Sequence, residues 1–279
     1  IAQSEDTQDV NAVLAAARAD YQRLIGALYE YGYYGGVISI KVDGAEVSDL
    51  PLAKPVRAIR KIDVRVDPGP LYTFSQAHMR PLAPATELTD GFRNGAPAAL
   101  RDIRLSARAA VAGWRDRGHA KADVGDQRIM AQHDGDTVAA TVVMAPGPLV
   151  RFGTFRLAAP SAVRAERIAQ ITGFPTGQVF SPARTEVAAD RLRRTGAFQA
   201  VRFQEDDLLG PGDTLDFALE VIDAKPRRFE FGAEVSSTDG AMLSAFWMHR
   251  NLFGGAERLR IEAEVSSIDG ATGGADWVL

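Results

Sequence analysis

The sequence predicts an α+β protein in which a small unit of strands and helices repeats along the chain and is followed by amphipathic strands. Three observations predict this class. The motif "PGPLYTF" begins at Pro68 and the similar "PGPLVRF" at Pro146, 78 residues later (146 − 68). The same interval from Pro148 leads to Pro226 (226 − 148 = 78). Beyond Pro226, apolar and polar residues alternate again, most clearly at Leu259 to Ser266, which is the period of a strand with two different faces.

A strand is predicted before each of these prolines, because apolar residues there recur at every second position. Such alternation is typical of a sheet with one buried face. The apolar positions are Ile62, Val64 and Val66 in the first copy, Val138, Ala140 and Val142 in the second, and Leu215, Phe217, Leu219 and Val221 in the third.

Helices are predicted between the strands, each ending at a glycine such as Gly118 or Gly196. "GFRNG" (91–95) matches "GFPTG" (173–177), and a helix is expected after each. In the third copy Ser181 is the expected N-cap and Pro182 the first helical residue. The expected inward faces are Val10, Leu14, Ala17, Tyr21, Ile25 and Leu28; then Ile103, Ala107, Val111 and Trp114; then Val187, Ala188 and Leu192.

Each unit is therefore expected to run strand, helix, helix, strand, strand. The first copy lacks its opening strand and first helix, and its long helix leads into a strand at Val37–Val42. One α+β domain with chance internal similarities is the alternative, but prolines, glycines and strand pattern recurring in register favour the repeat.

Composition excludes several classes of protein. A net charge of −4 does not suggest a nucleic-acid binder, and the absence of cysteine excludes disulfides, thiol nucleophiles and thiolate metal sites. The four histidines are far apart, and no phosphate-binding glycine loop or serine nucleophile motif is present. The sequence therefore predicts no catalytic residue, no cofactor and no metal, and we expect the protein not to be an enzyme.

The repeat unit resembles the POTRA domain (polypeptide-transport-associated domain) of the BamA superfamily of outer-membrane barrel proteins. "EYGYYGGVISIKV" (30–42), "RRTGAFQAVRF" (193–203) and "RNLFGGAERL" (250–259) carry the resemblance locally. Three units followed by a barrel resemble the layout of the TamA family, the outer-membrane subunits of the translocation and assembly module. This implies POTRA domains at 1–70 (N-terminally incomplete), 71–148 and 149–226, and the truncated start of an outer-membrane β-barrel at 227–279.

Three strands and two turns are expected in the last segment. The first strand carries Phe229, Phe231, Ala233 and Val235, and "STDGA" (237–241) would turn it into a second strand at Met242–Arg250. By resemblance, Asn251, Leu252, Phe253, Gly254 and Gly255 form a periplasmic turn. In the third strand, Arg258 to Ser267, a charge facing lipid costs about 2–4 kcal/mol at mid-depth. We therefore expect Arg260, Glu262 and Glu264 to face the lumen, and Leu259, Ile261, Ala263 and Val265 to face lipid. A soluble sandwich is the alternative, since its half-buried strands alternate in the same way.

The resemblance implies an assembly or translocation factor in the outer membrane of a Gram-negative bacterium, with its POTRA domains in the periplasm. The open sheet edges of the arm would receive extended chains. The first barrel strand, at Phe229, Phe231, Ala233 and Val235, would form a weak seam that templates client strands. Implied partners are a TamB-like protein anchored in the inner membrane, unfolded outer-membrane clients such as autotransporters, and outer-membrane lipid. Within the first unit we expect Ile38, Ile40 and Val42 to mark the edge that meets the partner.

Other functions stay open at this point. A two-partner secretion transporter or a BamA-type insertase also combines POTRA domains with a barrel. A soluble periplasmic scaffold, or a secreted enzyme whose catalytic domain lies elsewhere, would need no barrel.

Overall fold

The computed structural model describes residues 2–50, 59–236, 240–267 and 270–278, and it contains two compact units. The first unit comprises Ile1–Trp114 and Ala122–Pro146, and the second comprises Arg115–Lys121 and Gly147–Leu279. Each unit contains two sheets. Among the described residues, no helix combines the length and the apolar character needed to cross a bilayer.

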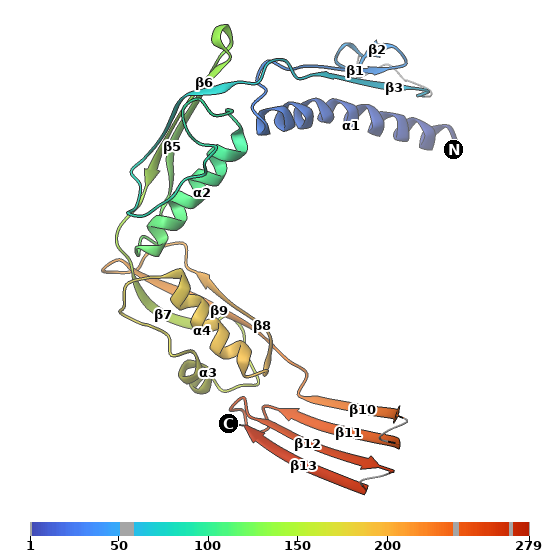
Figure 1. Cartoon of the computed structure of the whole chain (residues 1–279), viewed down its shortest axis with the longest axis vertical. Coiled ribbons are helices and arrows are strands. Elements are labelled where there is room, and N and C mark those ends of the chain that lie inside the picture. Colours follow the sequence, from blue (N-terminus) through green and yellow to red (C-terminus); the bar gives the residue numbers. More distant parts are fainter. Residues whose placement is uncertain (1, 51–58, 237–239, 268–269, 279) are drawn as a thin grey trace. The chain divides into compact units, whose positions relative to one another are not determined.

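The first sheet lies beside a long helix. Helix α1 (Ala2–Glu30) is followed by β1 (Val37–Val42), β2 (Ala45–Glu46), a 3-10 turn η1 (Val47–Asp49) and β3 (Ile62–Asp67). The strand order is β2-β1-β3, and α1 runs along one face of the sheet (Figure 1). As expected, Leu14 and Ala17 of α1 are buried, and they pack with Ile40, Val42 and Val47. The side chain of Val10 lies outside the described part of the structure.

The second sheet combines parallel and antiparallel pairing. The segment that forms this sheet runs β4 (Thr73–Arg80), helix α2 (Leu100–Asp116), β5 (Asp123–Gln132), the 3-10 turn η2 (His133–Gly135) and β6 (Thr137–Ala145). The order is β4-β6-β5, with β4 parallel to β6. Ile103 of α2 is buried in one cluster with Val138, Ala140 and Val142, and Ala107 and Val111 pack against this cluster, which confirms these three positions of the helix. The predicted Trp114 is outside the cluster, and Ala110 is buried in it instead.

One predicted helix is absent from this part of the chain. Residues 81–99 form turns in place of the first of two helices. Pro81, Pro84 and Pro97 lack the N–H that a helix interior requires, and Ala85 has φ +63°, which is outside the helical region.

The third sheet has the expected order of elements. The segment that forms this sheet and its two helices runs β7 (Arg151–Leu157), α3 (Ala165–Thr172), α4 (Pro182–Arg194), β8 (Phe198–Glu205) and β9 (Thr214–Asp223). Its strand order, β7-β9-β8 with β7 parallel to β9, repeats that of the second sheet. Ser181 and Pro182 start α4 as predicted, and Ala188 and Leu192 are buried. The prediction for Val187 is wrong: it is 48% exposed, and Ala189 faces the core because the buried stripe of α4 runs through 188, 189 and 192.

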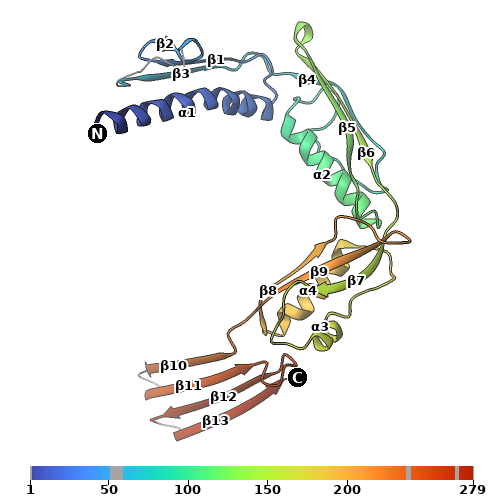
Figure 2. The ribbon, with the colours of Figure 1, turned by 180° about the vertical axis from the view of Figure 1, so that it is seen from behind.

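A fourth, antiparallel sheet ends the described chain. Its strands are β10 (Arg227–Ser236), β11 (Gly240–Arg250), β12 (Arg258–Ser266) and β13 (Gly270–Val278), side by side in chain order (Figure 2). The strand β13 was not predicted, because "GATGGADW" contains three glycines and weakly favours a strand. The predicted hairpin residues 237–239 lie outside the described residues.

Candidate functional site

The sheet β10–β13 has one almost wholly apolar face. Strand register places Phe229 opposite Trp247, which in turn is opposite Ile261. The predicted rows Phe229, Phe231, Ala233, Val235 and Leu259, Ile261, Ala263, Val265 therefore lie on the same face, joined by the alternate residues of β11. Strand β13 continues the face with Ala271, Gly273, Ala275 and Trp277. These apolar side chains are well exposed, with Phe231 at 80% and Val235 at 85%.

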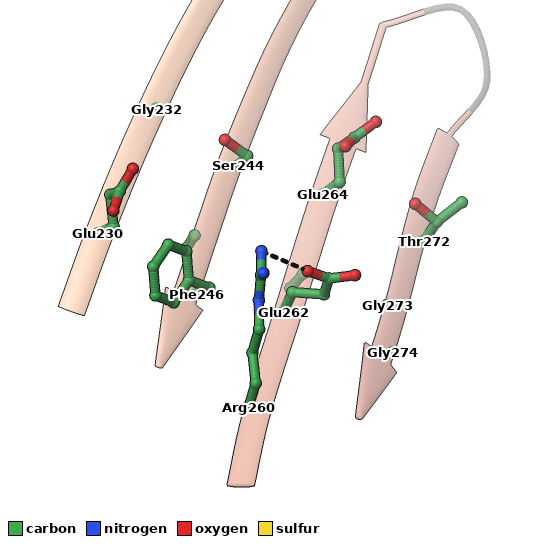
Figure 3. A pocket seen from close by; sticks show the side chains of 12 residues that line it. Glu230, Gly232, Ser244, Phe246, Arg260, Glu262, Glu264, Thr272, Gly273 and Gly274 are labelled. Atoms are coloured by element: carbon green, nitrogen blue, oxygen red, sulfur yellow. Dashed lines mark ion pairs between the residues drawn. The ribbon is translucent and has the colours of Figure 1, made fainter. Parts of the chain in front are cut away.

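The opposite face of this sheet is polar and charged. Figure 3 shows Glu230, Arg260, Glu262 and Glu264 around a hollow, with Phe246 among them. Arg260 forms an ion pair with Glu262 at 2.8 Å and lies over the Phe246 ring, 4.6 Å from its centroid. Charged groups on one face and apolar groups on the other suit a sheet between water and an apolar phase.

The turn between β11 and β12 is held by a carboxylate. The side chain of Glu257 is buried, and its Oε2 accepts the N–H groups of Phe253 and Gly255, both at 3.2 Å. Asn251, at φ +60°, accepts the N–H of Ala256 through Oδ1 at 3.0 Å. Asn251, Leu252, Phe253, Gly254 and Gly255 therefore form an ordered turn between two strands, as the sequence predicted.

Burial and hydrogen bonding act on Glu257 in opposite directions. Burial raises the pKa of Glu257. Hydrogen bonds from backbone N–H groups and the nearby Arg164 guanidinium lower this pKa, and their combined effect is larger, so the pKa is below its usual value. The carboxylate is therefore charged at neutral pH.

This turn also contacts the start of helix α3. Arg164 donates to the carbonyl of Gly254 through its backbone N–H at 2.9 Å and through Nε at 3.3 Å. Arg167 donates through Nε to the carbonyl of Gly255 at 3.1 Å. The third sheet and the fourth are thus connected by direct hydrogen bonds within one unit. Sequence reasoning missed Arg164, Arg167 and Glu257, because their partners are backbone atoms that only folding brings near.

The strand Val37–Val42 is not a sheet edge along its whole length. As β1 it pairs with β3 from Val37 to Val42, and its other side pairs with β2 at Lys41 and Val42. Ile40 and Val42 are core residues, 1% and 3% exposed, and only Ile38 is partly exposed. The N–H of Ile40 donates to Glu46 Oε1 at 2.8 Å. The prediction of a free edge here is therefore wrong, because Glu46 and β2 fold back onto it.

The open edge of the first sheet is β3. In the second and third sheets the corresponding strands, β6 and β9, are central, and each pairs on its outer side with a parallel strand. In the first sheet, β3 pairs only with β1 among the described strands. The consequence is visible in exposure: Val64 is 57% exposed, whereas Val142, at the matching position 78 residues later, is 1% exposed. An unpaired edge beside exposed apolar side chains can accept another extended chain.

The second and third sheets each have one open edge strand. In the third sheet, β7 is covered near its start, where Phe152 N–H donates to Gln178 and Gly177 N–H donates to Phe152. The segment 95–98 covers the start of β4 in the same way. Strands β5 and β8 are the remaining edges of these two sheets.

Comparison with known proteins identifies similar folds. No protein-family model matches the chain, and no curated protein does. BamA from Haemophilus ducreyi lacking POTRA domains 1–3 has a TM-score of 0.56 and 18% identity, over 70% of this chain and 38% of that chain. POTRA domains 3–5 of Haemophilus influenzae BamA have a TM-score of 0.51 and 18% identity, over 74% and 80%. CdiB from Escherichia coli has a TM-score of 0.40 and 14% identity, over 96% and 46%.

The likeness to the two BamA structures is one of fold, since identity is low. The chain spans well under half of the first BamA structure. Over about 70% of its length it nevertheless has the arrangement of sheets and helices found in POTRA-bearing structures. Of these three structures, the two with a TM-score above 0.5 are both BamA structures that contain POTRA domains, and what this chain shares with them is the fold.

Proposed function

We propose that the chain is the periplasmic arm and the first barrel strands of an Omp85-superfamily protein that assembles or translocates other proteins at the outer membrane of a Gram-negative bacterium. Within that superfamily we propose the TamA type, on the local sequence resemblance. The proposal assigns no enzymatic activity and no cofactor to the chain.

The two-faced sheet β10–β13 is the observation that carries this proposal. One face presents apolar side chains on all four strands, and the other gathers the charges of Glu230, Arg260, Glu262 and Glu264. Strand lengths of nine to eleven residues suit a tilted crossing of the apolar layer. We propose that the apolar face contacts lipid and that the charged face lines a lumen.

The edge strand β10 supports a role in client insertion. It pairs with β11 on one side, and its other side is unpaired among the described strands. In the proposed function this side forms the seam, with Phe229, Phe231, Ala233 and Val235 directed to lipid, where a client strand pairs through backbone hydrogen bonds.

The β3 edge is the proposed docking site for an extended strand of a TamB-like, inner-membrane-anchored partner. Its exposed row of Ile62, Val64 and Val66 lies on the same face as the buried Ile40 and Val42. A partner strand with apolar residues at alternate positions would extend that buried row. Unfolded outer-membrane clients would use the β5 and β8 edges.

Gel mobility of the full-length protein tests the membrane part of the proposal. The protein is extracted from outer membranes and run with and without boiling. A folded barrel resists detergent and migrates differently before heating, so a shift is expected. No shift, with the protein found in the soluble periplasmic fraction, would leave a scaffold function and reject the barrel.

Site-specific photocrosslinking tests the partner edge. A photoreactive residue at Val64, on the exposed edge, should capture the partner in cells, whereas one at the exposed Val187 of helix α4 should not. Capture within the same polypeptide would mean that the protein completes its own sheet, and the partner edge would then be rejected.

A further inference from the structure

Arginine side chains gather where helix α4 ends against the polar face of the sheet β10–β13. Two neighbouring hollows of about 250 and 320 Å³ lie there, and both are lined by Arg258. Among the described residues that line them, Asp276 is the single acidic one. The arginines are Arg167, Arg194, Arg228, Arg250, Arg258 and Arg260.

Four of these arginines have their charge or their hydrogen bonds already engaged. One of them is Arg250, which donates to the carbonyl of Lys225 at 3.4 Å. Arg228 pairs with Glu230 at 2.7 Å, and Arg260 pairs with Glu262 at 2.8 Å. Arg167 donates to the carbonyl of Gly255. These contacts hold the rim of the hollows in place.

Among the described residues, Arg194 and Arg258 have no side-chain partner, and Arg250 has a backbone carbonyl but no carboxylate as its partner. Arg250 and Arg258 are directly opposite each other on adjacent strands. Like charges in directly opposed positions destabilise a sheet. By contrast, Arg193, next to Arg194 on α4, pairs with both Glu186 and Asp190. The fold thus leaves a local excess of positive charge that an anion would neutralise.

We propose that this arginine cluster binds a phosphate group, carried by a lipid headgroup or free in solution. A phosphate monoester has a charge of about −1.5 to −2 and three acceptor oxygens. It can therefore accept from several guanidinium groups at once, and arginine forks match its geometry. A single carboxylate has one charge and two oxygens, which one arginine satisfies. The two unpartnered guanidinium groups of Arg194 and Arg258, together with the unneutralised charge of Arg250, thus favour phosphate over the carboxylate of a peptide.

The site is independent of the client seam. It lies at the end of the sheet where Arg250 and Arg258 border the turn, and it uses residues of both α4 and β12. The ligand would bridge the third repeat and the first strands.

The test uses the full-length protein in an uncharged detergent. Binding of inorganic phosphate is followed by calorimetry, and binding of phosphatidic acid is followed by native mass spectrometry, with diacylglycerol as the lipid that lacks phosphate. The variant Arg194→Gln/Arg258→Gln should raise the dissociation constant for phosphate at least about tenfold, because the loss of one charge-assisted hydrogen bond already corresponds to about a tenfold change. Arg184→Gln, near the opposite end of α4, is the matched control and should leave binding unchanged.

The outcomes separate the ligand sources. Phosphatidic acid bound more tightly than inorganic phosphate, with both weakened in the double variant, identifies a lipid headgroup. Arginine-dependent binding of inorganic phosphate alone identifies free phosphate. Equal binding by the wild type and the double variant overturns the proposal, as does the absence of binding by both inorganic phosphate and phosphatidic acid. Arg194→Gln alone, at an exposed helix end, repeats the test if the double variant does not fold.

Discussion

A charge placed at the middle of strand β11 measures what the apolar face contacts. Ala245 is the central residue of β11, five residues from each end, and its neighbours across the sheet are Phe231 and Ala263. If the face contacts lipid, Ala245→Arg puts a guanidinium near the bilayer midplane. The expected loss is then about 2–4 kcal/mol in the free energy of unfolding.

Two further arginine variants on the same strand calibrate this value. Ala241 is on the same face, four residues away, which is about 14 Å along the strand and about 10 Å along the membrane normal at the usual tilt. Ala241→Arg should therefore cost only about 0–1 kcal/mol. Ser244 is on the charged face, opposite Glu264, so Ser244→Arg should cost less than Ala245→Arg.

The assay is reversible unfolding of the full-length protein from phospholipid vesicles in guanidinium, followed by tryptophan fluorescence and extrapolated to zero denaturant. The expected order of destabilisation is Ala245→Arg first, with Ala241→Arg and Ser244→Arg well below it. A cost below about 0.5 kcal/mol for Ala245→Arg, or one no larger than that of Ser244→Arg, would refute a lipid-facing role for this face.

The remaining predictions concern the helix α4 and the turn. Leu192→Ala should lower the free energy of unfolding of the third sheet and its helices by about 2–5 kcal/mol. Val187 is half-exposed, so Val187→Ala should cost much less, and calorimetry of the two variants measures the difference. Glu257→Ala leaves the N–H groups of Phe253 and Gly255 without their acceptor, so the free energy of unfolding should fall by about 1–3 kcal/mol. Amide hydrogen exchange at both residues should become faster. Glu257→Gln retains an acceptor oxygen and should cost less. Because folding lowers the pKa of Glu257, the stability that its carboxylate contributes is complete above the unfolded value of about 4.3 and is lost as pH falls through the folded value. A protection factor at these two amides that stays constant across that range, after correction for the pH dependence of intrinsic exchange, would contradict the assignment.

Much of the local structure could be predicted because it depends on short-range chemistry. Alternation through Leu215, Phe217 and Leu219 dictates a strand with one buried face in almost any context. Proline after Ser181 and glycine at 118 and 196 mark helix ends through fixed backbone geometry. The rows of apolar residues in β10 and β12 likewise share a face, because antiparallel register preserves the two-residue period.

Tertiary structure alone decided which strands are edges and which charges are shared. The sequence pattern of Ile62, Val64 and Val66 is the same as that of Val138, Ala140 and Val142, yet the first row is exposed and the second buried, because burial depends on a neighbouring strand. Strand β1 lies inside its sheet because Glu46, five residues after Lys41, pairs with it and accepts the N–H of Ile40. The side chain of Glu257 accepts a backbone N–H of the turn that it ends. Arg194 and Arg258 are 64 residues apart (258 − 194) and line one hollow only after folding. Periodicity is a local property, whereas pairing and charge proximity depend on contacts between distant segments, so the sequence determined the faces and the fold determined the site.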